Sequence, residues 1–418
     1  MTPPPPTATA SIGRHYDDLD RLRRLNPMYD AVIDEIDGRM IRIGDQWLAD
    51  FASCNYLGFD LDPEIMDAVE PMVRRWGTHP SWSRLLGNPR PYVEIEERLT
   101  ELLGAPDTLV LPTISHIHST VIPLLAGQGT VLMDGQAHKT IYDGCSIARG
   151  RGATLVRFPA NDPWALEQEL RLTAPGAPRL VCMDGVNSMT GNVPDLATFA
   201  HICREYDALL YVDDAHGFGV IGDSPDAAHP YGLRGNSIVR HVGESYDNVV
   251  LVGGFSKAYS SLLAFLALPT ELKNFLKVAA PTYLYSGPSP TASLATVLAG
   301  FDVNATRGEA IRADLHDKTA RVISTVNALG LYTPNASGLP IVELPLTRGE
   351  DIDEVGNFLF ARGVYVTLAA YPLVPRSQVG FRVQVTAANT HEEITHLCDV
   401  LRELCQRFDM AAAVPDSL

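Results

Sequence analysis

Three polar clusters carry the residues whose types suggest chemistry, and each follows an apolar run. VDDAHGFGV contains Asp213 and His216, VGGFSKAYS contains Lys257, and MDGVNSMTG contains Asp184 and Ser188. Taken singly, each has an ordinary explanation, because an Asp at a strand end is usually a cap or turn residue and a loop Lys is usually solvated. Only their combination indicates a function.

Together, these side chains fit the needs of an aldehyde cofactor with a pyridine ring. A lysine amine condenses with an aldehyde only when it is deprotonated, and burial lowers the pKa of a lysine toward that state. A carboxylate beside the ring nitrogen keeps that nitrogen protonated, and a histidine can donate to the phenolic oxygen. A lysine paired with an acid is the usual arrangement for pyridoxal phosphate. We therefore expect a Schiff base on Lys257, supported by Asp213 and His216.

The elements that must position these residues form a regular alternation. Seven short apolar runs are predicted strands: 108–112, 130–134, 153–158, 179–185, 208–214, 248–253 and 264–268. Most are continuously hydrophobic, which suits strands buried on both faces of a parallel sheet. Helix-like segments such as 162–172 and 195–206 lie between them, which predicts an α/β fold with a mostly parallel seven-stranded sheet. In such sheets, ligands bind at the carboxyl ends of the strands.

The pattern changes near residue 290. Helical segments at 293–301, 310–329, 351–362 and 391–408 enclose strand candidates at 340–345, 364–369 and 381–386. We predict an N-terminal tail and arm over 1–50, a large cofactor-binding α/β domain over 51–290 and a smaller α+β domain over 291–418.

Composition excludes several classes of protein. The net charge of −17 argues against a nucleic-acid partner. The longest apolar runs are too short to span a membrane, and MTPPPPTATAS has neither the basic start nor the apolar stretch of a secretory signal, so it is expected to be a disordered tail. The six cysteines form no CxxC pair or regular framework, which favours reduced thiols in the cytoplasm.

The motifs, taken in order, resemble the α-oxoamine synthase family of fold-type-I pyridoxal-phosphate enzymes. That family includes 8-amino-7-oxononanoate synthase, 5-aminolevulinate synthase and serine palmitoyltransferase. The matching motifs are NYLGF at 55–59, SRLLG at 83–87, EIEERL at 94–99, DGVNSMTG, VDDAHGFGVIG, FSKA and FRVQVTAANT.

The resemblance implies roles for individual residues around the cofactor. Lys257 matches the Schiff-base lysine, which also moves protons at the substrate α-carbon. Asp213 matches the acid at the pyridine nitrogen, and His216 and Ser188 match the partners of the phenolic oxygen. His138, in DGQAHKTIYDG, matches the histidine that stacks on the cofactor ring.

The phosphate is expected at a helix start, where backbone N–H groups bind anions. By position, Thr113, Ile114 and Ser115 form that turn, with Ser256 and Ser286 as secondary candidates. In the family, the segment matching 285–287 reaches the phosphate of the neighbouring subunit, which implies a homodimer with shared active sites.

The substrate residues are also implied by the resemblance. Arg382 matches the arginine that grips the substrate carboxylate, a bidentate task that suits a guanidinium. Asn55 or Cys54 matches the asparagine that assists it, and Ser83 is a further substrate-binding candidate.

Several segments depart from the family pattern. The glycine-rich stretch before SR reads THPSWSR, and the phosphate turn reads TISHIHS, which adds His116 and His118. Three residues before the lysine, the family has a threonine where this sequence has Gly254. After the lysine, Leu263 and Phe265 replace a glycine pair of the family. We predict no metal site, because the spacing of His116 and His118 suits a strand better than a helical ligand pair.

The preferred hypothesis is a decarboxylative condensation of an α-amino acid with an acyl thioester, either acyl-coenzyme A or an acyl carrier protein, which gives an α-amino ketone. One alternative keeps the cofactor in an aminotransferase, an aldol-type lyase or another carbon–carbon bond-forming enzyme. Another is a non-catalytic partner subunit, but such subunits tend to lack the lysine, and Lys257 is present.

Overall fold

The computed structural model describes residues 17–174 and 176–412, so the proline-rich tail predicted at the N-terminus lies outside the described residues. The chain divides into two compact units, which are described separately. The larger unit comprises 54–188 and 192–314; the smaller comprises the chain up to Ser53, Met189–Gly191 and the chain from Leu315. The predicted domains placed a boundary near 290 and set the first 50 residues apart, whereas here the N-terminal arm belongs to the same unit as the C-terminal segment.

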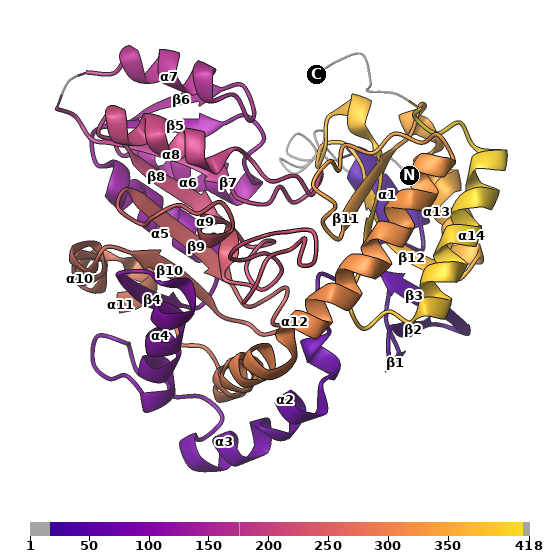
Figure 1. Ribbon diagram of the computed structural model, residues 1–418, viewed down its shortest axis with the longest axis horizontal. Helices are drawn as coiled ribbons and strands as arrows, with labels where there is room; N and C mark the ends of the chain where they lie inside the picture. Colours follow the sequence, from indigo (N-terminus) through magenta and orange to yellow (C-terminus); the bar gives the residue numbers. More distant parts are fainter. Residues whose placement is uncertain (1–16, 175, 413–418) are drawn as a thin grey trace, which may run out of the picture. The chain divides into compact units, whose positions relative to one another are not determined.

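The larger unit is built on one seven-stranded sheet with the order β4-β10-β9-β8-β7-β5-β6 (Figure 1). Its strands are β4 (Asp107–Leu111), β5 (Thr130–Asp134), β6 (Thr154–Phe158), β7 (Arg179–Asp184), β8 (Leu209–Asp213), β9 (Val249–Gly254) and β10 (Ala264–Leu268). β10 is antiparallel to both β4 and β9, and the pairs from β9 to β6 are all parallel. The predicted fold class, a mostly parallel seven-stranded α/β sheet, is confirmed.

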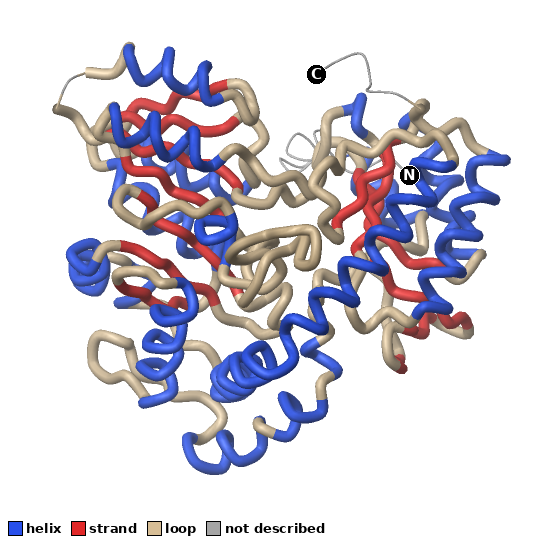
Figure 2. Tube along the Cα trace, viewed as in Figure 1, coloured by secondary structure: helices blue, strands red, loops and turns tan. Residues whose placement is uncertain are grey.

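Helices alternate with these strands along the chain, as Figure 2 shows in blue and red. They are α2 (Pro63–Asp67), α3 (Val69–Trp76), α4 (Arg90–Leu103), α5 (Ile114–Ala126), α6 (Lys139–Gly150), α7 (Pro163–Arg171), α8 (Leu196–Glu205), α9 (Ser237–His241), α10 (Thr270–Ala279) and α11 (Pro281–Leu284), with a 3₁₀ turn, η3, at Phe59–Leu61. Every residue of β9 and β10 is buried, because side chains cover both faces of the central strands.

One long helix, α12 (Thr291–Ala328), replaces the two helices predicted at 293–301 and 310–329. In the polar stretch between them, Asn304 is held by two contacts. Its Oδ1 accepts from the Arg312 guanidinium at 2.7 Å, and its Nδ2 donates to the Arg234 carbonyl at 3.0 Å. The two units divide within this helix, after Asp314.

The smaller unit contains a six-stranded sheet with the order β1-β2-β3-β12-β13-β11. Its strands are β1 (Glu35–Asp37), β2 (Met40–Ile43), β3 (Gln46–Phe51), β11 (Ile341–Pro345), β12 (Val364–Ala369) and β13 (Gly380–Gln384). Its other helices are α1 (Asp17–Leu25), α13 (Ile352–Ala361) and α14 (His391–Arg407), with 3₁₀ turns η4 (Gly349–Asp351) and η5 (Arg376–Gln378). The N-terminal arm thus supplies three strands, of which β3 pairs in parallel with β12.

The sheet of the larger unit brings the polar clusters together. Asp184 ends β7 and Asp213 ends β8, and the two residues are direct partners in the parallel register. The segment that carries Lys257 follows β9, the next strand along. None of the helices in the described part of the chain is long and apolar enough to cross a membrane.

Candidate active site

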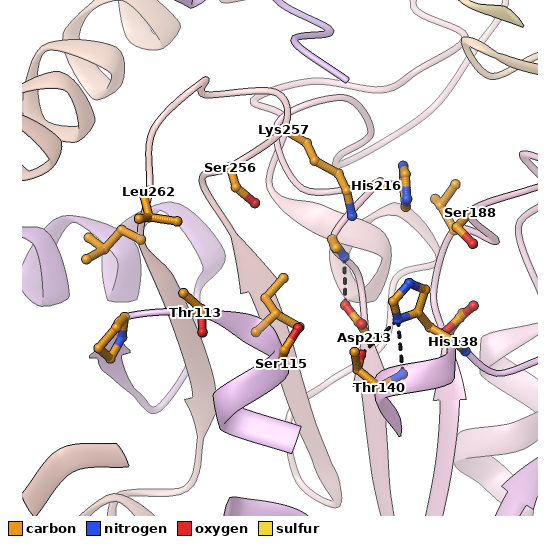
Figure 3. Close-up of a pocket in the computed structure, with 16 residues that line it drawn as sticks. Thr113, Ser115, His138, Thr140, Ser188, Asp213, His216, Ser256, Lys257 and Leu262 are labelled. Atoms are coloured by element: carbon orange, nitrogen blue, oxygen red, sulfur yellow. Dashed lines mark hydrogen bonds between the residues drawn. The ribbon is translucent and has the colours of Figure 1, made fainter. Parts of the chain in front are cut away.

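A pocket of about 190 Å³ lies where the strands of the larger unit end (Figure 3). Sixteen residues line it: Pro112, Thr113, Ile114, Ser115, His138, Thr140, Asp184, Val186, Ser188, Asp213, Ala215, His216, Ser256, Lys257, Leu262 and Leu263. They come from the ends of β4, β7, β8 and β9, the start of α6 and the segments that follow these strands. The pocket therefore collects nine of the residues predicted for the cofactor from five separate segments of sequence.

Lys257 is half-buried in the segment between β9 and β10. Its side chain extends toward Asp213, with His138 and Ser188 on one side of this space (Figure 3). Thr113 and Ser115 lie on the other side. This arrangement leaves room beside Asp213 for a ring and, farther along, for an anionic group at the start of α5.

The start of α5 faces the pocket as an anion-binding site would. Thr113 is the N-cap, Ile114 and Ser115 begin a helix of 13 residues, and all three line the pocket. The N–H groups of a first helical turn have no intrahelical partner and attract anions. Ser256, from the opposite segment, is exposed into the same pocket. These residues suit the phosphate of the predicted cofactor.

Gly254, one of the departures from the family pattern, lies against the side chain of Ile114. A Cβ at this position would lie 2.7 Å from Cδ1 of Ile114, which is closer than such contacts normally come. A threonine therefore does not fit beside Ile114 without a shift of that side chain.

Asp213 is nearly buried and has two protein donors. Its Oδ1 accepts the Ala215 N–H at 3.0 Å, and its Oδ2 lies 2.9 Å from His118 Nε2. Burial alone would raise the pKa of Asp213, but the hydrogen bond from His118 and the positive charge of Lys257 hold that pKa below its usual range. Asp213 is therefore an anion at the base of the pocket.

His216 is held from behind by a residue that the sequence did not single out. The hydroxyl of Tyr56, a fully buried residue of NYLGF, lies 2.8 Å from His216 Nδ1. When that hydroxyl donates to Nδ1, the other ring nitrogen, Nε2, carries the proton and can donate to a ligand. The contact thus suits the role predicted for His216.

His138 is the N-cap of α6 and is fixed by short-range contacts. Its Nδ1 lies 2.8 Å from Thr140 Oγ1 and accepts the Thr140 N–H at 3.4 Å. Its own backbone N–H donates to Asp184 Oδ1 at 3.0 Å. Burial, and then the charge of Asp213, raise the pKa of Asp184 well above its usual range. Asp184 therefore supports the loop that carries His138, a role that its position at a strand end does not indicate.

Four predicted residues of the larger unit do not line the pocket of their own chain. Asn55 Nδ2 donates to Asp60 at 2.9 Å, and the Ser83 hydroxyl donates to the Leu284 carbonyl at 2.7 Å. Cys54 is half-buried, and Ser286 is on an exposed segment. Their predicted roles in substrate or phosphate binding stay predictions.

Arg382 lies on β13 of the smaller unit. Its guanidinium donates to Gln384 Oε1 at 3.3 Å and lies 3.6 Å from Met189 Sδ. Its partner across the antiparallel pair of β11 and β13 is Glu343, a buried acid. Burial raises the pKa of Glu343 to about 7, although the charge of Arg382 opposes this shift.

Of the residues that depart from the family pattern after the lysine, Leu263 lines the pocket and Phe265 does not. Leu263 lines the pocket together with Leu262, which makes one wall apolar. Phe265 is buried in the core instead, with its ring centroid 4.8 Å from that of Phe218 and its ring against Gly253. In THPSWSR, His79 Nε2 lies 2.8 Å from the Pro288 carbonyl, which joins this stretch to YSGPSP.

The expectation that the spacing of His116 and His118 suits a strand is wrong, because both residues lie on α5. Positions two apart on a helix point in different directions. His118 is fully buried beneath the pocket, where it contacts Asp213 and Tyr211. Within the residues that the structure describes, no cluster of histidine, cysteine or acidic side chains is arranged to hold a metal ion.

Comparison with known proteins agrees with this geometry. The family model for aminotransferase class I and II matches residues 50–401. The 8-amino-7-oxononanoate synthase of Ectopseudomonas mendocina is 32% identical over 369 residues, which cover 88% of this chain and 90% of that protein. A putative 8-amino-7-oxononanoate synthase of Desulforudis audaxviator is 32% identical over 353 residues, which cover 84% and 88%.

Solved structures share the fold. The serine palmitoyltransferase of Sphingomonas wittichii superposes with a TM-score of 0.86 at 23% identity, covering 94% of this chain and 98% of that one. The 8-amino-7-oxononanoate synthase of Francisella tularensis superposes with a TM-score of 0.71 at 19% identity, covering 86% and 98%. The resemblance seen in the motifs is confirmed: the chain belongs to the aminotransferase class I and II family and, within it, to the α-oxoamine synthases, whose cofactor is pyridoxal phosphate.

Proposed function

We propose that this chain joins an α-amino acid to an acyl thioester with loss of the amino acid's carboxylate as carbon dioxide, so that an α-amino ketone and a free thiol are formed. The observation that carries the proposal is the convergence of Lys257, Asp213 and His216 on one pocket in a member of this family. When bound, pyridoxal phosphate supplies an electron sink that stabilises negative charge at the α-carbon.

Different residues of the pocket bind different atoms of the cofactor. Lys257 would hold it covalently and move protons at the α-carbon, and ionised Asp213 would accept a hydrogen bond from its ring nitrogen. His216 and Ser188 would bind its phenolic oxygen, and His138 would pack on its ring. The fit rests on the anionic Asp213 at one end of the pocket and the start of α5 at the other.

The phosphate is bound by the first turn of α5. Thr113, Ile114 and Ser115 supply backbone N–H groups and hydroxyls, and Ser256 adds a hydroxyl from the segment after β9. Ser286 acts on the phosphate of a neighbouring subunit. That assignment is supported by its position between the exposed residues Tyr285 and Gly287, away from the pocket of its own chain.

Arg382 binds the carboxylate of the amino acid in a bidentate contact, assisted by Asn55 or Cys54 and by Ser83. Glu343 is buried across the strand pair from Arg382. When Glu343 is ionised, its negative charge weakens the attraction of Arg382 for the substrate carboxylate. Coenzyme A or a carrier protein presents the acyl group, and the apolar wall made by Leu262 and Leu263 suits an aliphatic chain.

The assembly is a homodimer with shared active sites. Large apolar side chains are exposed on two segments that a hydrogen bond from Ser83 to Leu284 joins. Trp82 is 56% exposed, Leu86 is 82% exposed and Tyr285 is 83% exposed. Clustered exposed apolar groups of this kind mark interaction surfaces. A second copy of the chain would cover them and bring Ser286 to its partner's site.

The enzyme works in the cytoplasm, with no nucleic-acid partner. All six cysteines are free thiols, as a reducing compartment requires. The net charge of −17 disfavours nucleic acid.

The proposal is tested by incubating the cofactor-loaded enzyme with amino acids, among them glycine, alanine and serine, and with acyl thioesters of several chain lengths. Thiol release, carbon dioxide release and the amino ketone are measured together. The proposal predicts equal amounts of all three with one pair of substrates. Amino-group transfer to a keto acid, without thiol release, would contradict it and identify an aminotransferase.

A further inference from the structure

A chain of three buried polar side chains lies behind the pocket. Tyr211 is on β8, His118 is on α5, and Asp213 ends β8. The Tyr211 hydroxyl lies 2.8 Å from His118 Nδ1, and His118 Nε2 lies 2.9 Å from Asp213 Oδ2. Tyr211 and His118 are fully buried, and only Asp213 reaches the pocket.

The acceptor character of Asp213 fixes one proton of this chain, the one on His118 Nε2. Ionised Asp213 can only accept, so His118 Nε2 must carry a proton and donate it to Oδ2. Burial raises the pKa of Tyr211 well above its usual range, so its hydroxyl keeps its proton. Tyr211 can therefore donate to His118 Nδ1, which fixes both the orientation of the ring and the nitrogen that carries the proton.

Asp213 lies among several charged groups, and its hydrogen bond with His118 is one of the contacts that hold its carboxylate. The carboxyl of Asp184 is its neighbour across the strand pair, and Asp214 follows it in the sequence, so two further acids lie close. Lys257 and His138 face Asp213 from the pocket, and their charges lower the pKa of Asp213. Apart from the Ala215 N–H, His118 supplies the hydrogen bond that holds this carboxylate in place.

We propose that His118, held by Tyr211, is a positioning residue that fixes the carboxylate of Asp213 for its contact with the cofactor ring. The inference rests on the role of Asp213 in the proposed function, but not on the identity of the substrates. His118 does not line the pocket and acts only through Asp213. A histidine that merely filled the core would stabilise the fold without changing how the cofactor binds.

The test compares cofactor binding in four variants: His118→Phe, Tyr211→Phe, Asp213→Asn and the double variant His118→Phe/Asp213→Asn. Apo-enzyme is titrated with pyridoxal phosphate, and the dissociation constant and the visible spectrum are recorded from pH 5 to pH 9. Circular dichroism checks that each variant is folded. Should His118→Phe fail to fold, His118→Leu takes its place, because it also removes the donor to Asp213.

His118→Phe is expected to weaken cofactor binding about tenfold or more, because a charged hydrogen bond to Asp213 is lost. The spectrum of this variant should also gain a dependence on pH that the wild type lacks. Tyr211→Phe, which leaves the contact between His118 and Asp213 in place, should change binding about threefold or less. The double variant should bind no more weakly than Asp213→Asn alone, because His118 acts through that carboxylate.

Wild-type affinity and spectrum in His118→Phe would overturn the inference, and so would additive losses in the double variant. An Asp213→Asn variant that binds the cofactor normally would instead overturn the role of Asp213. Neither result depends on turnover, so the product assay remains a separate test of the reaction.

Discussion

The hydroxyl of Tyr56 and Nδ1 of His216 lie 2.8 Å apart, although 160 positions separate the two residues in the sequence. Tyr56 belongs to NYLGF, ahead of η3, and His216 follows β8. Both are buried, and only His216 lines the pocket, so the contact holds the histidine from outside the pocket. The motif that resembled a family signature thus has a physical role here.

Replacing Tyr56 with Phe should slow turnover three- to tenfold, because the lost hydrogen bond frees the His216 ring and its tautomer. Steady-state kinetics measure this effect. Tyr259→Phe is a matched control, since the Tyr259 hydroxyl is buried without a hydrogen-bond partner among the described residues. Equal effects of the two substitutions on turnover would argue against a role for the contact with His216.

Arg84, in the SRLLG motif, is predicted to act on stability and not on chemistry. Its guanidinium is buried, donates to Asn88, Val110 and Glu96, and lies 4.3 Å from the centroid of the Tyr92 ring. Arg84→Ala should lower the free energy of unfolding by about 3 kcal/mol or more, because buried partners lose their donor. Chemical denaturation measures this loss, and Arg84→Lys should recover part of it. An Arg84→Ala variant with wild-type stability would contradict the prediction.

Glu343 gives a prediction about pH. Its pKa rises from 4.5 to about 7 on folding, so its contribution to stability is full below pH 4.5 and is lost as the pH rises through 7. That rise corresponds to about 3 kcal/mol. Glu343→Gln should therefore gain stability over the wild type between pH 5 and pH 8.

Urea denaturation at several pH values follows this difference. Glu354→Gln makes the same chemical change at an exposed position of α13 and serves as the control. A gain that does not depend on pH would show that the charge of Glu343 is not its cause.

The exposed apolar residues give a prediction about assembly. Leu86→Asp should shift the dimer toward monomer and weaken cofactor binding, because Ser286 of one subunit would no longer reach the other site. Leu172→Asp, at an 81% exposed position of the larger unit, should leave the assembly unchanged. Analytical ultracentrifugation distinguishes the two, and a wild-type monomer would contradict the shared site.

The sequence predicted the sheet and most of the pocket because both depend on local pattern. The strands that end at Asp184 and Asp213 are continuous apolar runs, and a parallel sheet places their ends at one edge. The start of α5 followed from its position after β4. Lys257 could be assigned because the motif FSKA accompanies the aspartate.

The contacts behind the pocket could not be predicted, because they join residues far apart in the chain. Nothing in NYLGF indicates that Tyr56 reaches His216, and TISHIHS does not show which histidine turns toward Asp213. The N-terminal strands were missed for another reason. β1 has three exposed residues, so it lacks the alternation by which a strand is recognised.

The central claim is that Lys257 binds the cofactor covalently, and reductive labelling tests it most directly. The purified enzyme loaded with pyridoxal phosphate is treated with borohydride and digested, and mass spectrometry locates the modified lysine. The expected label is on the peptide that contains Lys257, absent from Lys257→Ala and retained in Lys139→Ala, which removes the lysine next to His138. A label on any other lysine, or bound cofactor that borohydride does not fix, would contradict the assignment.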